Sequence, residues 1–248
     1  MSSPNFAGLK ALFINCTLKK SPAESHTQTL MDVSKRIMKN ESATVDEIRL
    51  IDHDVPPGVN FDMTENGYDK DEWPDLWKRI NAADILIIGT PIWLGEKSSV
   101  AQKLIERLYA MMIAESNDKG QNIFYGKVGG CIITGNEDGA KHCSMGILYS
   151  LQHVGFSIPP QADSAWLGEV GPGPSYGDTE YNDKKLDSPA GFDTNFTNRN
   201  TTILTYNLLH LARMLKEQNG YPGYGNSKKA WSDGERWKFE KPEKIHNK

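Results

Sequence analysis

The 248-residue sequence has no long hydrophobic run, no excess of positive charge and only three cysteines. Its longest apolar stretches, such as residues 85–88, fall far short of the roughly 20 residues that a membrane-spanning helix needs, so we expect no membrane span. The net charge of -4 argues against a nucleic-acid-binding protein. Residues 1–9 lack the basic start and apolar core of a secretory signal, and we expect a cytoplasmic protein.

Cysteine, histidine and glycine occur without the spacings of common metal and nucleotide sites. The three cysteines form no C-x-x-C pair and the histidines no H-x-x-x-H pair, so we expect reduced thiols and no metal. A Walker A loop and a G-x-G-x-x-G fingerprint are absent. The C-x5-R loop of a tyrosine phosphatase is absent too, because Pro22 stands six residues after Cys16. We therefore expect Cys16 to be a small structural residue.

Short apolar runs alternate with helical periodicity along the first 160 residues. The runs at 9–15, 44–50, 84–90, 128–134 and 156–158 predict five strands, and the stretches between them predict helices. With right-handed crossovers, this alternation predicts an α/β fold. Its centre would be a doubly wound five-stranded parallel sheet in the order 2-1-3-4-5, with helices on both faces.

Capping patterns and a late change of composition mark the expected boundaries. The pattern S-x-x-Q at Ser25 and at Ser99 predicts two helix starts. Residues 161–200 are rich in Gly, Pro, Asp and Asn, and a segment this long without structure suggests an insertion. We expect one domain over residues 1–220 that contains this insertion. Residues 221–248 would form a C-terminal tail, extended or in contact with another subunit.

The candidate ligand site lies at the carboxyl ends of the first and third strands, where the winding of such a sheet reverses. The loop after the first strand carries Thr17, Lys19 and Ser25 and ends on a helix N-terminus. Backbone N–H groups there favour an anion such as a phosphate. A solvated loop with an ordinary Ser25 cap explains the same residues equally well. His142 is expected on a helix surface.

Two loops at this edge carry more specific patterns. Residues 90–95 read T-P-x-[aromatic or apolar]-x-G and precede a serine-rich helix start. In the first loop, Thr17 and Lys19 stand at the serine and arginine positions of a G-S-x-R-x-x-[SG]-x-[NT] pattern, with Cys16 in place of the glycine. Together with residues 134–139, these loops resemble those of the flavodoxin-like NAD(P)H-dependent FMN reductases and tryptophan-repressor-binding-protein-type quinone reductases. The resemblance covers residues 9–158.

This resemblance implies one FMN site built from three loops. The first loop would hold the phosphate, and the indole of Trp93 would lie against the flavin ring. Gly135 would allow a close approach of the backbone, Asn136 would bond the pyrimidine edge, and Glu137 would be a turn former or would lower the flavin potential. The implied cofactor-binding residues are Thr17, Lys19, Ser25, His26, Thr27, Pro91, Ile92, Trp93, Leu94, Gly95, Thr134, Gly135, Asn136, Glu137, Asp138 and Gly139.

The implied activity is that of an FMN-dependent oxidoreductase. NAD(P)H would deliver hydride to the flavin, and a quinone, flavin, nitro or azo compound would accept the electrons without a protein nucleophile or general base. Residues 58–71 and 161–200 would shape the acceptor pocket, and the resemblance implies a homodimer or homotetramer. Two alternatives stay open: a flavodoxin-type electron carrier, and a flavin-free regulatory or scaffold protein, suggested by Cys16 and Lys19.

Overall fold

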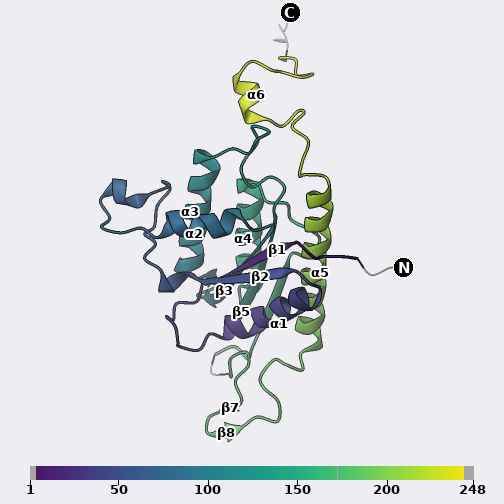
Figure 1. The fold of residues 1–248 in the computed structure, drawn as a ribbon. Coiled ribbons are helices and arrows are strands. Elements are labelled where there is room, and N and C mark those ends of the chain that lie inside the picture. The colour runs from purple at the N-terminus through teal and green to yellow at the C-terminus, as the bar shows by residue number, and fades with distance from the viewer. Residues whose placement is uncertain (1–3, 172, 243–248) are drawn as a thin grey trace, which may run out of the picture.

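The computed structural model describes residues 4–171 and 173–242, in which strands and helices alternate around a central sheet (Figure 1). The strands are β1 (Lys10–Asn15), β2 (Thr44–Arg49), β3 (Ile85–Trp93), β4 (Glu96–Lys97), β5 (Val128–Gly135), β6 (Asp163–Leu167), β7 (Glu180–Tyr181) and β8 (Lys184–Lys185). The helices are α1 (His26–Asn40), α2 (Trp73–Asn81), α3 (Ser99–Ala114), α4 (Ala140–Val154), α5 (Asn195–Glu217) and α6 (Lys228–Ser232), with short 3-10 helices at Leu50–Asp52 and Met63–Asn66.

Five parallel strands form the sheet in the order β2-β1-β3-β5-β6, which confirms the predicted doubly wound α/β fold. The strands β1, β3 and β5 are buried almost throughout, because helices cover both faces of the sheet. Strand β2 lies at the edge; its first four residues alternate between exposed and partly buried, and Ile48 is buried. The short strand β4 pairs antiparallel with the end of β3.

The fifth parallel strand is not where the sequence predicts it. Residues 156–158 contribute only an isolated bridge between Ser157 and Val128, whereas β6 follows Pro159 and Pro160. The ring of Phe156 stacks on Phe124 in the core, with centroids 4.7 Å apart. The apolar run at 156–158 therefore reflects core contacts, and the sheet edge comes from the segment that was expected to be an insertion.

The two faces of the sheet carry different helices (Figure 1). Helices α1 and α5 pack on one face and contact each other, and α2, α3 and α4 pack on the opposite face. Ser25 caps α1 as predicted, since its side chain accepts a hydrogen bond from the Gln28 N–H. The cap of α3 is Ser98, one residue before the predicted Ser99, because the Ser98 hydroxyl accepts from the Ala101 N–H and donates to the Cys16 carbonyl at 2.6 Å.

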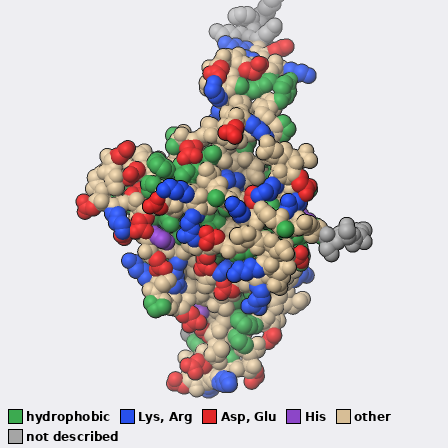
Figure 2. Space-filling model, viewed as in Figure 1, with side chains coloured by type: hydrophobic (Ala, Val, Ile, Leu, Met, Phe, Trp, Pro, Cys, Tyr) green, Lys and Arg blue, Asp and Glu red, His purple; other side chains and the backbone are tan. Residues whose placement is uncertain are grey.

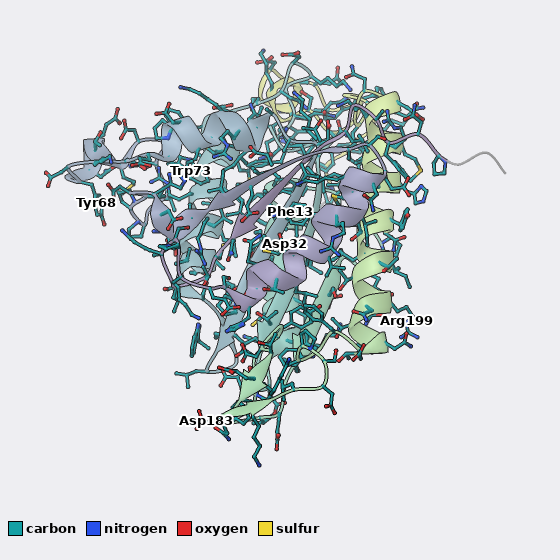
Figure 3. All side chains as sticks on the ribbon, turned by 60° about the horizontal axis from the view of Figure 1, so that its bottom comes forward. Phe13, Asp32, Tyr68, Trp73, Asp183 and Arg199 are labelled. Carbon is teal, nitrogen blue, oxygen red and sulfur yellow. The ribbon has the colours of Figure 1, made fainter. Side chains whose placement is uncertain are left out.

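Three segments extend from this core. Residues 58–71 form an outer loop that bears the exposed Tyr68, and Asp183 lies at the tip of the β7–β8 hairpin (Figure 3). The buried ion pair between Arg107 and Asp71, at 2.7 Å, anchors the outer loop. The third segment is the tail with α6, which projects from the body and shows hydrophobic side chains on its surface (Figures 1 and 2). The last part of the predicted tail, 243–248, lies outside the described residues.

Among residues 4–171 and 173–242, no helix combines the length and hydrophobicity that crossing a bilayer requires.

Candidate functional site

A pocket of about 500 Å³ lies at the carboxyl ends of β1, β3, β5 and β6. This is the edge at which the sheet order reverses, and where such sheets bind ligands. Most of the residues implied by the sequence resemblance line this one pocket. They are Thr17, Lys19, Ser25, His26, Thr27, Pro91, Ile92, Trp93, Thr134, Gly135, Asn136 and Glu137.

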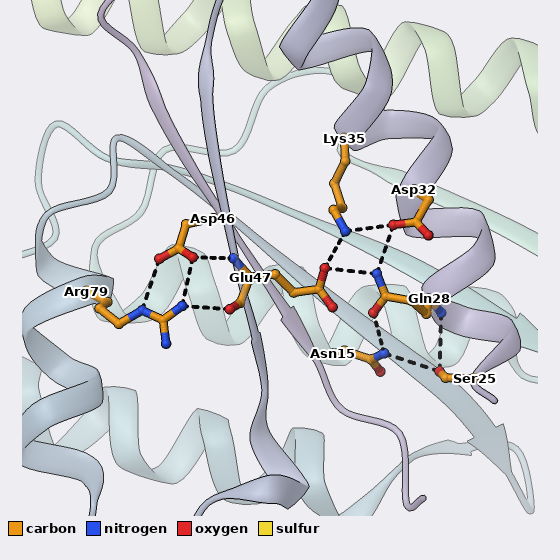
Figure 4. A network of polar contacts seen from close by, with 8 residues as sticks. All are labelled: Asn15, Ser25, Gln28, Asp32, Lys35, Asp46, Glu47 and Arg79. Atoms are coloured by element: carbon orange, nitrogen blue, oxygen red, sulfur yellow. Dashed lines mark hydrogen bonds and ion pairs between the residues drawn. The ribbon is translucent and has the colours of Figure 1, made fainter. Parts of the chain in front are cut away.

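The first wall of the pocket is the loop of residues 16–25, which the buried Asn15 holds in place. The Asn15 Oδ1 atom accepts a hydrogen bond from the Thr17 N–H at 3.0 Å, and its Nδ2 donates to Ser25 and Gln28 at 3.2 and 2.8 Å (Figure 4). The Gln28 amide donates in turn to Glu47 on β2, at 2.9 Å. Side-chain hydrogen bonds thus connect the loop of residues 16–25 to the edge strand β2.

The N-terminus of α1 opens into this loop. The first N–H groups of a helix have no intrahelical partner, and the Ser25 hydroxyl satisfies that of Gln28 only. The N–H groups of His26 and Thr27 are thus without a partner from the helix, which suits an anion such as a phosphate. Lys19, exposed at the rim, adds a positive charge.

A hydroxyl pair forms part of the pocket floor. The Thr27 and Thr134 Oγ1 atoms lie 2.7 Å apart, and both side chains are buried. Thr27 belongs to α1 and Thr134 to β5, two strands away from β1 in the sheet. This bond therefore fixes two walls of the pocket relative to each other.

The second loop is a tight hairpin between β3 and β4. Its turn residues, Leu94 and Gly95, have φ values of 52° and 76°, as in a two-residue type I′ turn. Leu94 is 94% exposed, and neither turn residue lines the pocket. A Cβ atom at Gly139 would lie 2.5 Å from the Gly95 carbonyl oxygen, so the absence of a side chain at Gly139 lets the second and third loops touch. Asp138 also lies outside the pocket lining.

In the third loop, residues 136–139, only Asn136 and Glu137 line the pocket, and Gly139, like Asp138, does not. Both N–H groups of the Asn136 amide point at the chain: Nδ2 donates to the carbonyls of Gly173 and Pro174, at 3.0 and 2.8 Å. Its implied bond to a pyrimidine edge would have to use Oδ1 alone. Gly135 is needed for the sheet itself, since an added Cβ would lie 3.0 Å from Ile92.

A further wall, residues 166–171 and 173–178, carries no motif that the sequence resemblance could transfer. We call it the late segment, and it contributes Trp166, Val170, Gly171, Ser175 and Tyr176 to the pocket, while Leu18 adds to the first wall. The rings of Trp166 and Tyr176 meet edge to face at 5.5 Å. His26 approaches the Tyr176 carbonyl at 3.2 Å. The signal that the sequence offers here is the pair of aromatic residues within a stretch rich in glycine and proline. Residues 58–71, expected to shape the acceptor pocket, do not line it.

Ionisable groups near the pocket differ in their availability. Complete burial raises the pKa of the Cys16 thiol far above its ordinary value, so the thiol stays protonated. Glu137 is among the residues that line the pocket, but its Oε1 atom is inaccessible to solvent and has no hydrogen-bond partner in the described part of the chain. His142 lies on the surface of α4, 2.5 Å from Glu96, whose pKa this bond lowers. Within residues 4–171 and 173–242, no cluster of His, Cys, Asp or Glu is arranged to hold a metal ion.

Comparison with known proteins defines the class. The sequence profile of the NADPH-dependent FMN reductases matches residues 9–166, and the chain belongs to this family. Family membership supports an FMN-dependent oxidoreductase with a flavodoxin-like fold.

Two curated relatives are similar over most of the chain. The chain is 37% identical over 218 residues to the 8-demethyl-8-aminoriboflavin-5'-phosphate synthase of Streptomyces davaonensis, a match that covers 84% of this chain and 79% of that protein. It is 54% identical over 213 residues to the divalent metal cation transporter MntH of Mycobacterium bovis. The second match covers 86% of this chain but only 30% of the transporter's length.

Solved structures show the same architecture. RosB with bound 8-demethyl-8-formylriboflavin-5'-phosphate superposes with a TM-score of 0.78 at 33% identity, over 96% of this chain and 92% of RosB. The apo form of the NADH:FMN oxidoreductase EMOB has a TM-score of 0.54 at 12% identity, over 88% and 97% of the two chains, and shows the fold alone.

The pocket has the features that a flavin mononucleotide requires. Its volume of about 500 Å³ lies within the range of small-molecule sites. Free helix N–H groups lie at one end, and the aromatic side chains of Trp93, Trp166 and Tyr176 line the walls. The donors at the helix N-terminus and the aromatic walls together fit FMN.

Proposed function

We propose that the chain is an NAD(P)H-dependent oxidoreductase that holds FMN in the pocket at the carboxyl ends of β1, β3, β5 and β6. The observation that carries the proposal is that three loops, distant along the sequence, line one pocket with a helix N-terminus at one end. Bound FMN would supply the redox chemistry, accepting hydride from NAD(P)H and reducing a quinone, flavin, nitro or azo compound.

The chain's own residues would bind and orient the cofactor and exclude water. Thr17, together with the N–H groups of His26 and Thr27, would hold the phosphate, and Lys19 would complement its charge. Trp93, 56% exposed at the pocket, would cover part of the ring while leaving room for a second small molecule. The late segment would close the opposite side.

Substitution of Thr17 tests the phosphate end. The Thr17→Glu variant places a carboxylate beside the proposed phosphate, and we expect FMN affinity to fall by about 100-fold or more. The exposed Thr44→Glu variant on β2 introduces the same charge far from the pocket and should bind FMN normally. Titration of the apoproteins with FMN, followed by flavin fluorescence, measures both. Equal affinities would remove the first loop from the site.

Turnover distinguishes the proposal from an electron carrier and from a flavin-free scaffold. The FMN-loaded protein should oxidise NADH or NADPH continuously when a quinone is present, at a rate that follows the quinone concentration. A yellow protein without turnover would be a carrier, and a protein that takes up no added FMN would be a scaffold. Light scattering on the same samples tests the proposed homodimer or homotetramer.

A second candidate function is modification of FMN itself. It is favoured by the 37% identity to a synthase of an 8-amino flavin phosphate and by the likeness to RosB holding an 8-formyl flavin phosphate. In that case FMN would be the substrate of the same pocket. Mass spectrometry of flavin recovered after turnover decides: unchanged FMN supports a cofactor, and a changed mass supports a substrate.

A further inference from the structure

The described part of the tail, residues 221–242, is attached to the body by buried polar contacts at its base. The Gln121 side chain is fully buried, and its Nε2 atom donates to the Pro222 carbonyl at 2.8 Å. The buried Ser227 hydroxyl caps α6 and donates to the Gly120 carbonyl at 3.1 Å. The tail therefore has a defined orientation on the body, from which it projects (Figure 1).

Aromatic side chains gather on the projecting part of the tail. Trp231 stacks on Trp237 with ring centroids 6.2 Å apart, and Phe239 meets Trp231 edge to face at 5.5 Å. Trp231, Phe239 and Tyr224 nevertheless remain exposed, and Figure 2 shows hydrophobic side chains on this part of the surface. A contiguous apolar cluster outside the core marks a surface that another molecule covers.

The outer loop, residues 58–71, also projects from the body and exposes apolar side chains. Val59, Phe61 and Tyr68 are all exposed. The buried Arg107 side chain fixes the loop by donating to the Phe61 carbonyl at 2.9 Å. No residue of the loop lines the pocket, so ligand binding there does not account for its apolar surface.

The tail and the outer loop carry opposite charges. Basic side chains outnumber acidic ones in residues 221–242, and the reverse holds in the loop. Lys228 and Lys238 of the tail are exposed, and no ion pair among the described residues includes them. The same is true of Glu65 and Asp69 of the loop, whereas Lys70 is neutralised by two carboxylates beside it. Each apolar surface thus lies beside charges that attract the other.

The two projections lie apart within one chain. The tail leaves the body beyond α5, at the top of Figure 1, and the outer loop lies at the left. Figure 3 gives a second direction, in which Tyr68 on the loop is again far from α6. A second copy related by a two-fold axis can bring its outer loop to the tail of the first. The same rotation places its own tail on the loop of the first copy.

We infer that the tail docks on the outer loop of a second copy of this chain, in a two-fold dimer in which each copy contributes one tail and one loop. A single interface then covers both apolar surfaces and pairs their free charges. The inference does not depend on FMN, because neither segment lines the pocket.

Charge reversal with complementation tests the pairing. Lys228→Glu/Lys238→Glu reverses the tail, and Glu65→Lys/Asp69→Lys reverses the loop. Each double variant alone places like charges at both contacts, so we expect its dimer dissociation constant to rise about 100-fold or more. An equimolar mixture has opposite charges at both contacts and should form a heterodimer with about the wild-type affinity. Analytical ultracentrifugation measures these constants.

Two further variants accompany the charge reversals. Lys184→Glu/Lys185→Glu makes the same change of charge on the exposed β7–β8 hairpin and should keep the wild-type dissociation constant. Trp231→Ala removes the ring that contacts both Trp237 and Phe239, and the dimer should weaken about 30-fold or more. If the wild-type protein is a tetramer, loss of this contact leaves dimers instead of monomers.

The outcomes separate this inference from the proposed function. A monomeric wild-type protein would overturn the inference, and so would an oligomer that both double variants keep. A mixture of the two variants that stays dissociated would show that the tail meets a surface other than the loop, which also overturns it. Titration of every variant with FMN should give the wild-type affinity, and a failure of the wild type to bind FMN would refute the proposed function alone.

Discussion

The strand-end loops and the late segment form opposite walls of one pocket but are held in different ways. The first, second and third loops follow directly from β1, β3 and β5, and the second and third loops touch through backbone atoms at Gly95 and Gly139. The late segment is bonded to the third loop and to α1 through the side chains of Asn136 and His26. The strand-end loops thus meet in a close backbone contact, whereas the late segment also depends on side-chain hydrogen bonds.

A pair of glycine substitutions gives the largest expected difference between the two walls. Gly139 and Gly171 both have positive φ values, but only Gly139 lacks space for a Cβ atom. Gly139→Ala should lower the free energy of unfolding by about 4 kcal/mol, through backbone strain and the clash with Gly95. Gly171→Ala should cost about 1 kcal/mol, for strain alone. Urea denaturation measures both, and similar losses would refute the contrast.

A substitution of Asn136 tests the hydrogen bonds that its side chain makes to the late segment. In Asn136→Asp the amide donors become a carboxylate facing the carbonyls of Gly173 and Pro174. We expect FMN to bind roughly 30-fold more weakly, which corresponds to about 2 kcal/mol of binding free energy, and hydrogen exchange to be faster over residues 168–171 and 173–178. Asn207→Asp breaks a comparable bond to the Pro160 carbonyl on the surface and serves as the control. Unchanged exchange in Asn136→Asp would show that other contacts hold the segment.

The third comparison of the two walls uses the reactivity of cysteine thiols, and it disturbs the protein least. Cys16 in the first loop is fully buried with a raised pKa, and Cys131 and Cys143 are buried too. The native protein should therefore react slowly with Ellman's reagent at pH 8. A cysteine at the 65% exposed Val170 in the late segment, in Val170→Cys, should react within seconds and be protected by FMN. Rapid reaction of the wild-type protein would show that the first loop opens.

The strand-end loops could be predicted from the sequence better than the late segment, for a physical reason. Buried parallel strands appear as apolar runs, and the loops that follow them carry glycines, hydroxyls and a helix cap at fixed spacing. These local signals located β1, β3 and β5, together with Thr17, Trp93 and Thr134 at their ends. They also placed the cap of α3 within one residue.

The late segment depends on contacts between residues far apart in the chain. Its bonds to His26 and Asn136 span 150 and 37 residues, and no local pattern reports them. For the same reason β6 was missed: its five residues, DSAWL, show no continuous apolar run, and they form a strand because the edge of β5 is available. The prediction that Asn136 contacts the ligand remains a prediction, and the bonds of its amide to the Gly173 and Pro174 carbonyls are long-range contacts that no local pattern reports.

The Thr27–Thr134 hydroxyl pair determines how a ligand can reach its seat. It joins α1 to β5 beneath the pocket, so the phosphate end and the ring end cannot separate to admit a molecule from below. If FMN binds here as proposed, it would enter and leave through the open side of the pocket, where Trp93 is 56% exposed. The rate of its release would then depend on the groups at that side and not on the floor.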